Sequence, residues 1–188
     1  MRTNIGKVIK ELQTYRLRWS TESSTVERLI EFMSANPECF ERSLKEGHMT
    51  GSAWVVNQKG SHVLLTHHRK LNRWLQLGGH ADGDSNLLNV AMREAKEESG
   101  LDSIVPFSME IFDIDIHMIP ERGEEPEHFH YDVRYALQTT RNEAYVVSDE
   151  SHDLNWIEID NLRSVTKEDS MLRMASKWKL IKSGMRIH

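Results

Sequence analysis

Residues 78–101 read GGHADGDSNLLNVAMREAKEESGL, a glycine-bearing loop followed by an acidic segment with helical character. On a helix that turns by about 100° per residue, Glu94, Glu97 and Glu98 are neighbours at spacings of three and four residues. Like charges at these spacings destabilise an isolated helix, so a row of three carboxylates needs a physical reason. Whether water solvates these carboxylates or a cation neutralises them decides the function of the segment.

The row of glutamates has two interpretations. A run of charges usually coats a solvated helix face. In this segment, however, Leu87 and Val90 lie on the same side as the glutamates, so the row borders the apolar core. Carboxylates at a semi-buried edge suit a hard divalent cation, and the preceding Gly78–Gly79 pair can bring backbone atoms close to a ligand. We therefore predict a divalent metal site at this helix.

The flanking sequence predicts an α/β or α+β fold. Residues 4–46 have helical periodicity in three segments, the last of which is predicted to be a short helix beginning at Pro37. From residue 50 the pattern changes to runs typical of strands, and a helix from about residue 86 to 99 ends at Gly100. The predicted strands are 52–57, 62–68, 110–119, 128–138 and 153–160, and a closing helix is predicted over 167–183.

Length and composition exclude several classes of protein. The 188 residues suit a helical extension over residues 1–46 and one main domain over residues 47–188. Cys39 is the only cysteine, which excludes an internal disulfide and a cysteine-based zinc site and favours a reducing cytoplasm. The net charge of −5 disfavours nucleic acid as a partner, and no apolar run approaches the roughly 18 residues that cross a bilayer.

The glycine loop and the glutamates together resemble the signature of the Nudix hydrolase family. That signature is a glycine, five residues, a glutamate, seven residues and then R-E-U-x-E-E-x-G-U, where U is apolar. Eight of its nine defined positions agree over 23 residues, namely Gly79, Arg93, Glu94, Ala95, Glu97, Glu98, Gly100 and Leu101. The resemblance covers roughly residues 48–185 and is strongest to a bacterial subgroup with an N-terminal helical extension. It implies an α/β/α sandwich with a mixed sheet.

The resemblance also implies a reaction, the hydrolysis of a phosphoanhydride bond in a nucleoside diphosphate linked to another group. In the family, Mg²⁺, with Mn²⁺ as an alternative, would bind Glu94 and Glu98, the carbonyl of Gly78, and Glu97 directly or through water. Mg²⁺ keeps several waters and binds through a few carboxylates and substrate phosphates, so it would orient the diphosphate and acidify the attacking water. Arg93 would orient Glu94 through charge-assisted hydrogen bonds.

The identity of the general base stays open at the level of sequence. Glu94 is one candidate, and a carboxylate outside the signature is the other. Glu150 lies six residues before Trp156, about where the family often has such an acidic residue, and Asp149 and Asp153 compete with it. Glu150 is otherwise a surface residue in a polar run.

One signature position departs from the family pattern. Ser85 stands where the family has glutamate, and Asp84 offers a carboxylate one residue earlier. Either Asp84 replaces the missing glutamate from a shifted loop, or Asp84 or Ser85 only caps the N-terminus of the helix. We expect the capping role.

Polar and apolar residues alternate in the segments 110–119 and 128–138, which we expect to pair as a β-hairpin. Their polar residues would then share one face, which is either solvated or the wall of a substrate pocket. A His-ligated second metal is less favoured, because an HxH pair lacks a known third ligand. The candidate substrate-binding residues are His80, His117, His128, His130 and Arg134, with Asp113, Asp115 and Asp132 on the same face.

Three functions compete. The first is a pyrophosphohydrolase acting on a small-molecule nucleoside diphosphate derivative, and the second is a binding module of the same fold without catalysis. The complete REAKEE core disfavours the second, although Ser85 keeps it open. The third, an isopentenyl-diphosphate-isomerase-like enzyme, would need a catalytic cysteine, and Cys39 lies in the extension. The N-terminal helices are candidates for a homodimer contact.

Overall fold

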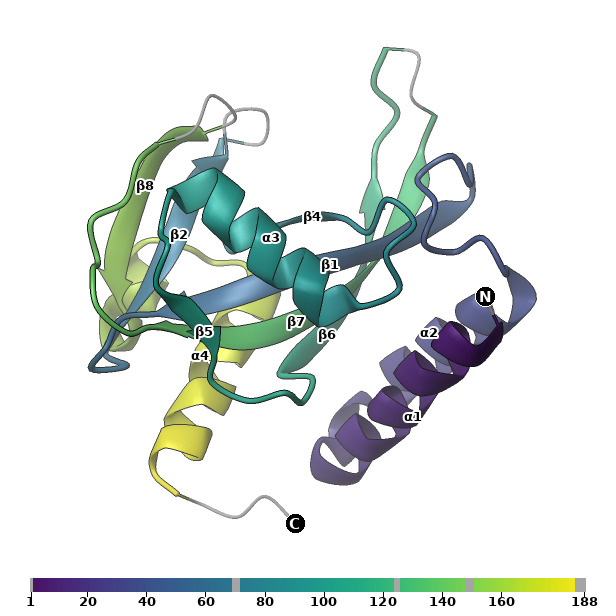
Figure 1. Cartoon of the computed structure of the whole chain (residues 1–188), viewed down its shortest axis with the longest axis horizontal. Coiled ribbons are helices and arrows are strands. Elements are labelled where there is room, and N and C mark those ends of the chain that lie inside the picture. Colours follow the sequence, from purple (N-terminus) through teal and green to yellow (C-terminus); the bar gives the residue numbers. More distant parts are fainter. Residues whose placement is uncertain (1, 69–71, 124–125, 148–150, 185–188) are drawn as a thin grey trace.

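Eight described strands form one mixed sheet with helices on both sides (Figure 1). The computed structural model describes residues 2–68, 72–123, 126–147 and 151–184. The strands are β1 (Gly47–Val56), β2 (His62–His68), β3 (Arg73–Leu75), β4 (Leu77–His80), β5 (Ile104–Pro106), β6 (Asp113–Ile119), β7 (His128–Thr139) and β8 (Ser151–Glu158). The helices are α1 (Arg2–Arg18), α2 (Ser23–Ala35), α3 (Leu87–Ser99) and α4 (Asp169–Lys182), with 3₁₀ turns η1 (Ser20–Glu22) and η2 (Ile159–Ser164).

The sheet is built around the parallel pair β1–β7, and its other pairs are antiparallel. The strand order is β3–β2–β1–β7–β5, with β4 paired to β1, β6 to β7 and β8 to β2. The hairpin of β6 and β7 is the one predicted from the alternating segments. The parallel β1–β7 pair joins segments that are far apart in the sequence, and it brings side chains of both strands onto common faces.

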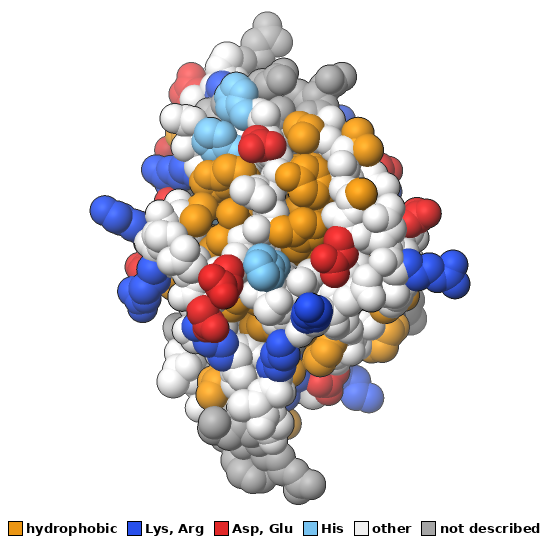
Figure 2. Space-filling view, turned by 90° about the vertical axis from the view of Figure 1, so that its left-hand side faces the viewer, with side chains coloured by type: hydrophobic (Ala, Val, Ile, Leu, Met, Phe, Trp, Pro, Cys, Tyr) orange, Lys and Arg blue, Asp and Glu red, His pale blue; other side chains and the backbone are white. Residues whose placement is uncertain are grey.

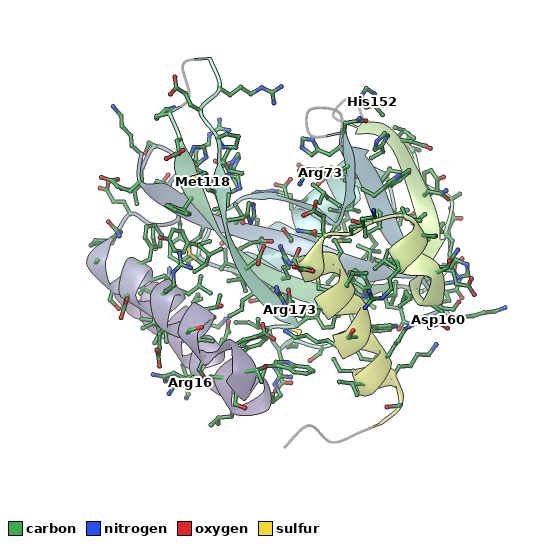
Figure 3. The ribbon with its side chains drawn as sticks, turned by 180° about the vertical axis from the view of Figure 1, so that it is seen from behind. Arg16, Arg73, Met118, His152, Asp160 and Arg173 are labelled. Atoms are coloured by element: carbon green, nitrogen blue, oxygen red, sulfur yellow. The ribbon has the colours of Figure 1, made fainter. Side chains whose placement is uncertain are left out.

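Helices cover both faces of this sheet, so the predicted α/β/α sandwich is confirmed. On one face α3 packs closely over Gly51, where a Cβ atom would overlap the carbonyl of Leu87 and the side chain of Val90. On the opposite face α4 places Trp178 in an apolar cluster with Trp54 and Phe112. Figure 3, seen from behind, shows α4 in front of the sheet.

The N-terminal helices α1 and α2 form a hairpin beside β6 and β7 (Figure 1). Their apolar residues, among them Leu12, belong to the same core cluster as Ile114 of β6. Phe32 of α2 stacks on Tyr131 of β7 with ring centroids 3.7 Å apart. The two helices predicted here are confirmed, and the extension shares a core with the sheet. The division into residues 1–46 and 47–188 stays a prediction.

The third helix predicted for the extension, from Pro37, is wrong. Residues 37–46 form successive turns, with hydrogen bonds such as Glu41 N–H to the carbonyl of Glu38. The carbonyl of Cys39 accepts a 2.7 Å hydrogen bond from Met49 N–H, a residue of β1, instead of from the next turn of a helix. Burial of Cys39 and Phe40 in the core fixes this path, and tertiary packing therefore overrides the local helical pattern.

The polar face of the β6–β7 hairpin is covered along part of its length. Asp113 lies opposite Arg134, and Asp115 lies opposite Asp132. Asp113, Asp132 and Arg134 are at most 2% exposed, so of the two interpretations of this face, the solvated one is wrong for this part of the sheet. The cover is α4, whose Arg173, labelled in Figure 3, reaches the carboxylates of Asp113 and Asp115.

The surface on the β8 side carries acidic and basic side chains around a group of apolar ones (Figure 2). Among the large apolar residues that are exposed, Val146 and Val147 belong to the loop that leads into β8. Within the described part of the chain, no helix is both long and apolar enough to cross a membrane.

Candidate active site

The glutamate row of α3 lies against β4, the edge strand that carries the two glycines. The backbone N–H of Gly78 donates a 2.8 Å hydrogen bond to Oε1 of Glu98. A Cβ atom at Gly79 would overlap the carboxylate of Glu94, so only glycine lets this carboxylate lie directly on the strand. The loop glycines and the helix glutamates therefore lie in direct contact.

Arg93 holds Glu94 in place. Its Nη2 donates to Oε1 of Glu94 at 2.8 Å and to the carbonyl oxygen of His80 at 3.0 Å. Its Nε also donates to Oε1 of Glu94, at 3.3 Å. The hydrogen bond to Glu94 is the main reason why the pKa of Arg93 is raised above its usual value. A guanidinium that bridges the helix carboxylate and the strand carbonyl fixes the position of Glu94 relative to β4.

The three glutamates differ in burial. Glu94, with 18% of its side chain exposed, and Glu98 are half-buried, whereas Glu97 is exposed at the rim. An all-oxygen donor set of this kind suits Mg²⁺, which needs one or two protein carboxylates and completes its shell with water and phosphate. The hydrogen bond between Gly78 and Glu98 runs through the N–H of Gly78 and not its carbonyl, so the carbonyl ligand remains a prediction.

Neither Asp84 nor Ser85 caps α3, and that expectation is wrong. The N-cap is Asn86, whose side chain accepts a 3.2 Å hydrogen bond from the N–H of Asn89. Asp84 instead accepts a 2.8 Å hydrogen bond from the N–H of Asn86 and so shapes the turn before the cap. The predicted helix end is confirmed, because Gly100 adopts a left-handed conformation with φ 67°.

Replacing Asn86 with alanine should lower the free energy of unfolding by about 1 kcal/mol, because α3 loses its cap. Chemical denaturation measures this change, and Ser85→Ala is the matched control that leaves the cap in place.

The same series tests Asp84: if it replaces the missing family glutamate, Asp84→Asn should reduce turnover far more than Ser85→Ala. Equal turnover in these two variants would refute that substitution.

Gly79→Ala should reduce turnover by about 10- to 100-fold, because the added methyl group displaces the Glu94 carboxylate and small misplacements in active sites have effects of this size. Steady-state kinetics measures the change. Gly6→Ala in α1, where a Cβ atom meets nothing within 4 Å, is the matched control and should keep full activity. A Gly79→Ala variant as active as Gly6→Ala would show that Glu94 does not depend on this close approach.

The structure gathers the predicted histidines into one cluster and adds a fifth. The ring centroids of His80, His117 and His128 lie 5.1, 5.4 and 5.1 Å from that of His130. His48 of β1, which is absent from the candidates predicted from the sequence, lies 4.9 Å from both His80 and His130, measured between ring centroids. It joins the cluster because β1 and β7 pair in parallel with His48 opposite His130. No local pattern around His48 indicates this long-range pairing.

The imidazoles of His48 and His130 are uncharged near neutral pH. Burial, together with the neighbouring His80 and His128, lowers the pKa of His48 to about 4. Burial and the surrounding histidines lower the pKa of His130 to about 2. A charged ring at either position would lose its hydration and be repelled by any neighbouring histidine that is also charged, which is the physical cause of both shifts.

Arg134 does not join the histidines. Its guanidinium is 2% exposed and donates to three carboxylates, those of Asp132 at 2.6 Å, Asp113 at 3.0 Å and Asp115 at 3.1 Å. Burial disfavours the charge on Arg134, but these carboxylates outweigh it and raise the pKa of the guanidinium above its usual value. A side chain that is buried and bonded in this way has a structural role, so Arg134 is not retained as a substrate-binding residue.

The carboxylates around Arg134 also connect the N-terminal helices to α4. Lys177 of α4, buried like Asp113, lies 2.5 Å from Oδ1 of Asp113 and 2.6 Å from Oε1 of Glu22. The hydroxyl of Tyr15 accepts a hydrogen bond from Lys177 and donates one to Glu22. We call these residues, together with those around Arg134, the ionic network. Its members are Tyr15, Glu22, Asp113, Asp115, Asp132, Arg134, Arg173 and Lys177.

The carboxylate predicted outside the signature, Glu150, lies outside the described residues, as does the competing Asp149. Asp153 is exposed on β8. Trp156, six residues after Glu150, donates through its ring nitrogen to the carbonyl of Glu143 at 2.8 Å. The assignment of the general base between Glu94 and Glu150 therefore stays a prediction.

Comparison with known proteins gives one family match. The model of the NUDIX domain matches residues 48–177, from β1 into α4. A search of curated proteins found no match.

Several solved structures share this fold. A hydrolase of the NUDIX family from Clostridium perfringens is 24% identical, with a TM-score of 0.53 over 71% of this chain and 97% of that chain. A C. elegans Ap4A hydrolase in a binary complex is 14% identical, with a TM-score of 0.55 over 73% and 98%. The NUDIX domain of Shewanella oneidensis NrtR, complexed with ADP ribose, is 14% identical, with a TM-score of 0.52 over 75% and 92%. At these identities the similarity shows the fold.

Proposed function

The chain belongs to the Nudix family and is a hydrolase of phosphoanhydride bonds, and from this premise we propose that it cleaves a nucleoside diphosphate linked to another group with the help of Mg²⁺. Mn²⁺ is the alternative ion. The observation that carries the proposal is the arrangement of Arg93, Glu94 and Glu98 on the glycines of β4. This arrangement positions two half-buried carboxylates, and the diphosphate of a substrate could reach them beside the exposed Glu97.

Each residue of the site has a separate role in the proposed hydrolysis. Glu94 and Glu98, with Glu97 and the carbonyl of Gly78, would hold Mg²⁺, which when bound neutralises phosphate charge and acidifies water. Arg93 keeps the Glu94 carboxylate in one orientation through its bridge to His80. The oxygen of the attacking water forms a new bond to phosphorus while the bond from phosphorus to the bridging oxygen breaks. Glu94 or Glu150, as general base, accepts a proton from the attacking water.

The substrate class is proposed from the same premise. ADP ribose in the Shewanella structure and the Ap4A hydrolase activity named for the C. elegans protein are both nucleotide derivatives that contain phosphoanhydride bonds. His80, His117, His128 and His130 stay proposed as substrate-binding residues, because Arg93 connects the carbonyl of His80 to the glutamate site and the other three rings cluster with that of His80. A cytoplasmic location, a homodimer contact by the N-terminal helices and the absence of nucleic-acid binding also remain proposals.

The two competing functions are less well supported. A binding module without catalysis would not need Arg93 to hold Glu94 against the strand, and that contact is formed. An isomerase-like mechanism would need a reactive cysteine, but Cys39 is buried in the core and burial raises the pKa of its thiol to about 11.

The test is release of nucleoside monophosphate from a panel of nucleoside diphosphate derivatives, including ADP ribose and Ap4A, in Mg²⁺. We expect hydrolysis of at least one member, abolished by excess chelator. Binding of a panel member without any turnover would support the binding module instead, and isomerisation of isopentenyl diphosphate would support the third function.

A further inference from the structure

Five histidines lie on one face of four neighbouring strands. In their order across the sheet they are His80 of β4, His48 of β1, His130 and His128 of β7, and His117 of β6. The register explains this placement: His48 is opposite His130, and His117 is opposite the same residue from the other side. Residues paired in register, and those two positions apart on a strand, point to the same face. This face is the one opposite to α3.

Three of these side chains have the separation of metal ligands. In His48, His128 and His130, one ring nitrogen of each residue lies within 4.8 Å of the others. Among the described residues, this is the one group of three candidate metal-ligating side chains with such spacing. The Nε2 atoms of His128 and His130 are 3.3 Å apart. A tetrahedral zinc ion with Zn–N bonds of about 2.0–2.1 Å places its ligand nitrogens about 3.3 Å apart.

The hydrogen bond of Nδ1 in His128 leaves the lone pair of its Nε2 for a metal ion. Its Nδ1 is 2.8 Å from the carbonyl oxygen of Pro126, which can accept only from a protonated Nδ1. The neutral ring of His128 then has its lone pair on Nε2, which is directed toward His130. A backbone carbonyl that binds the distal N–H is the usual partner of a metal-ligating histidine, because it fixes both the tautomer and the ring orientation.

His48 supplies the second, independent observation. It is 4% exposed, and at least one of its two buried ring nitrogens has no hydrogen-bond partner in the described part of the chain, because the backbone of Leu44 can partner only the other. Buried polar atoms without partners are rare in folded proteins and costly, so each needs an explanation. A bound cation would satisfy the ring nitrogen that has no partner. The low pKa values of His48 and His130 agree with this role, since only the neutral imidazole binds a metal.

We propose that His48, His128 and His130 form a site for a divalent transition-metal ion, with Zn²⁺ as the best fit, separate from the glutamate site of α3. Imidazole nitrogens favour zinc and its neighbours over Mg²⁺, which prefers oxygen. The two sites lie on either side of β4: Gly79 faces α3, and the next residue, His80, faces the histidines. The proposal does not depend on the hydrolase activity, because it rests on the imidazoles alone.

The experiment is a calorimetric titration of the chelator-treated full chain with Zn²⁺, in the presence of excess Mg²⁺ that occupies oxygen sites. We expect one equivalent of Zn²⁺ to bind. His128→Gln and His130→Asn should each weaken this binding by at least about 100-fold, more than the loss of an outer partner of a metal ligand usually causes. His62→Asn on β2 is the matched control, a half-buried histidine outside the cluster, and should bind as the wild type does.

One further variant separates this site from the proposed active site. Glu98→Gln should abolish hydrolysis and still bind one equivalent of Zn²⁺. If Zn²⁺ binding were lost in Glu98→Gln and kept in the two histidine variants, the ion would belong to the glutamates and the proposal would be overturned. Absence of saturable binding in the wild type would overturn it as well, and the histidines would then be a packed neutral cluster.

A measurement on the unaltered protein covers the case in which a histidine variant fails to fold. Co²⁺ substitutes for Zn²⁺ and is paramagnetic, so its binding shifts the NMR signals of the ring protons of ligating histidines. We expect strongly shifted exchangeable imidazole protons on addition of one equivalent. A spectrum with bound Co²⁺ but without such signals would place the ion on oxygen ligands and contradict the proposal.

Discussion

Glu98→Gln should reduce the turnover of phosphoanhydride hydrolysis by about 1000-fold or more. The variant removes one charged metal ligand, and charge stabilisation by a bound metal contributes several kcal/mol to catalysis. The fold should be preserved, because the amide oxygen of glutamine can still accept the hydrogen bond from Gly78 N–H. Steady-state kinetics measures turnover, and thermal unfolding checks that the variant is folded.

Glu97→Gln is the internal comparison for this prediction. Glu97 lies on the same helix but is exposed at the rim, so its replacement should have a smaller effect than that of Glu98. Wild-type activity in Glu98→Gln, or full activity of the unaltered protein in excess chelator, would refute the metal site on α3.

Asp113→Asn should lower the free energy of unfolding by about 3–5 kcal/mol, the usual cost of breaking a buried ion pair from one side. Asp113 is fully buried and accepts from Arg134 at 3.0 Å and from Nη2 and Nε of Arg173 at 2.8 and 2.9 Å. Lys177 lies 2.5 Å away on the same carboxylate. The variant keeps the shape of the side chain but leaves the cations of the ionic network with one carboxylate fewer.

Chemical denaturation measures this loss, and Asp160→Asn is its matched control. Asp160 also pairs with a lysine, at 2.6 Å, but its side chain is 81% exposed, so its removal should not change the midpoint of unfolding measurably. Equal midpoints for Asp113→Asn and the wild type would show that the ionic network does not stabilise the fold.

The pH dependence of the same difference gives a second check. Burial opposes ionisation of Asp113, but the bonds to Arg173 and the charges of Arg134 and Lys177 outweigh it and hold its pKa below the usual value. The stabilisation is therefore complete above the unfolded pKa of about 3.9 and is lost as the pH falls through the lower folded pKa. The difference between wild type and Asp113→Asn should stay constant from about pH 7 to 5 and shrink below about pH 4.

The sequence by itself determined the parts of this protein that depend on local spacing. The i, i+3 and i+4 positions of Glu94, Glu97 and Glu98, and the glycine at position 100, were enough to predict α3 and its row of carboxylates. The alternation in β6 and β7 was enough to predict their pairing. Each of these features involves residues that are close in the chain or follow one short loop, so periodicity reports them directly.

Tertiary structure decided the rest, because it depends on contacts between distant segments. His48 meets His130 only through the parallel pairing of β1 with β7, and neither strand contains a signal for that register. The burial of Arg134 required α4 to cover its face, and alternation cannot distinguish a face covered by a helix from one covered by water. The turns after Pro37 likewise depend on a distant contact. The N–H of Met49, in β1, donates a hydrogen bond to the carbonyl of Cys39, which in a local helix would accept from a residue of the next turn.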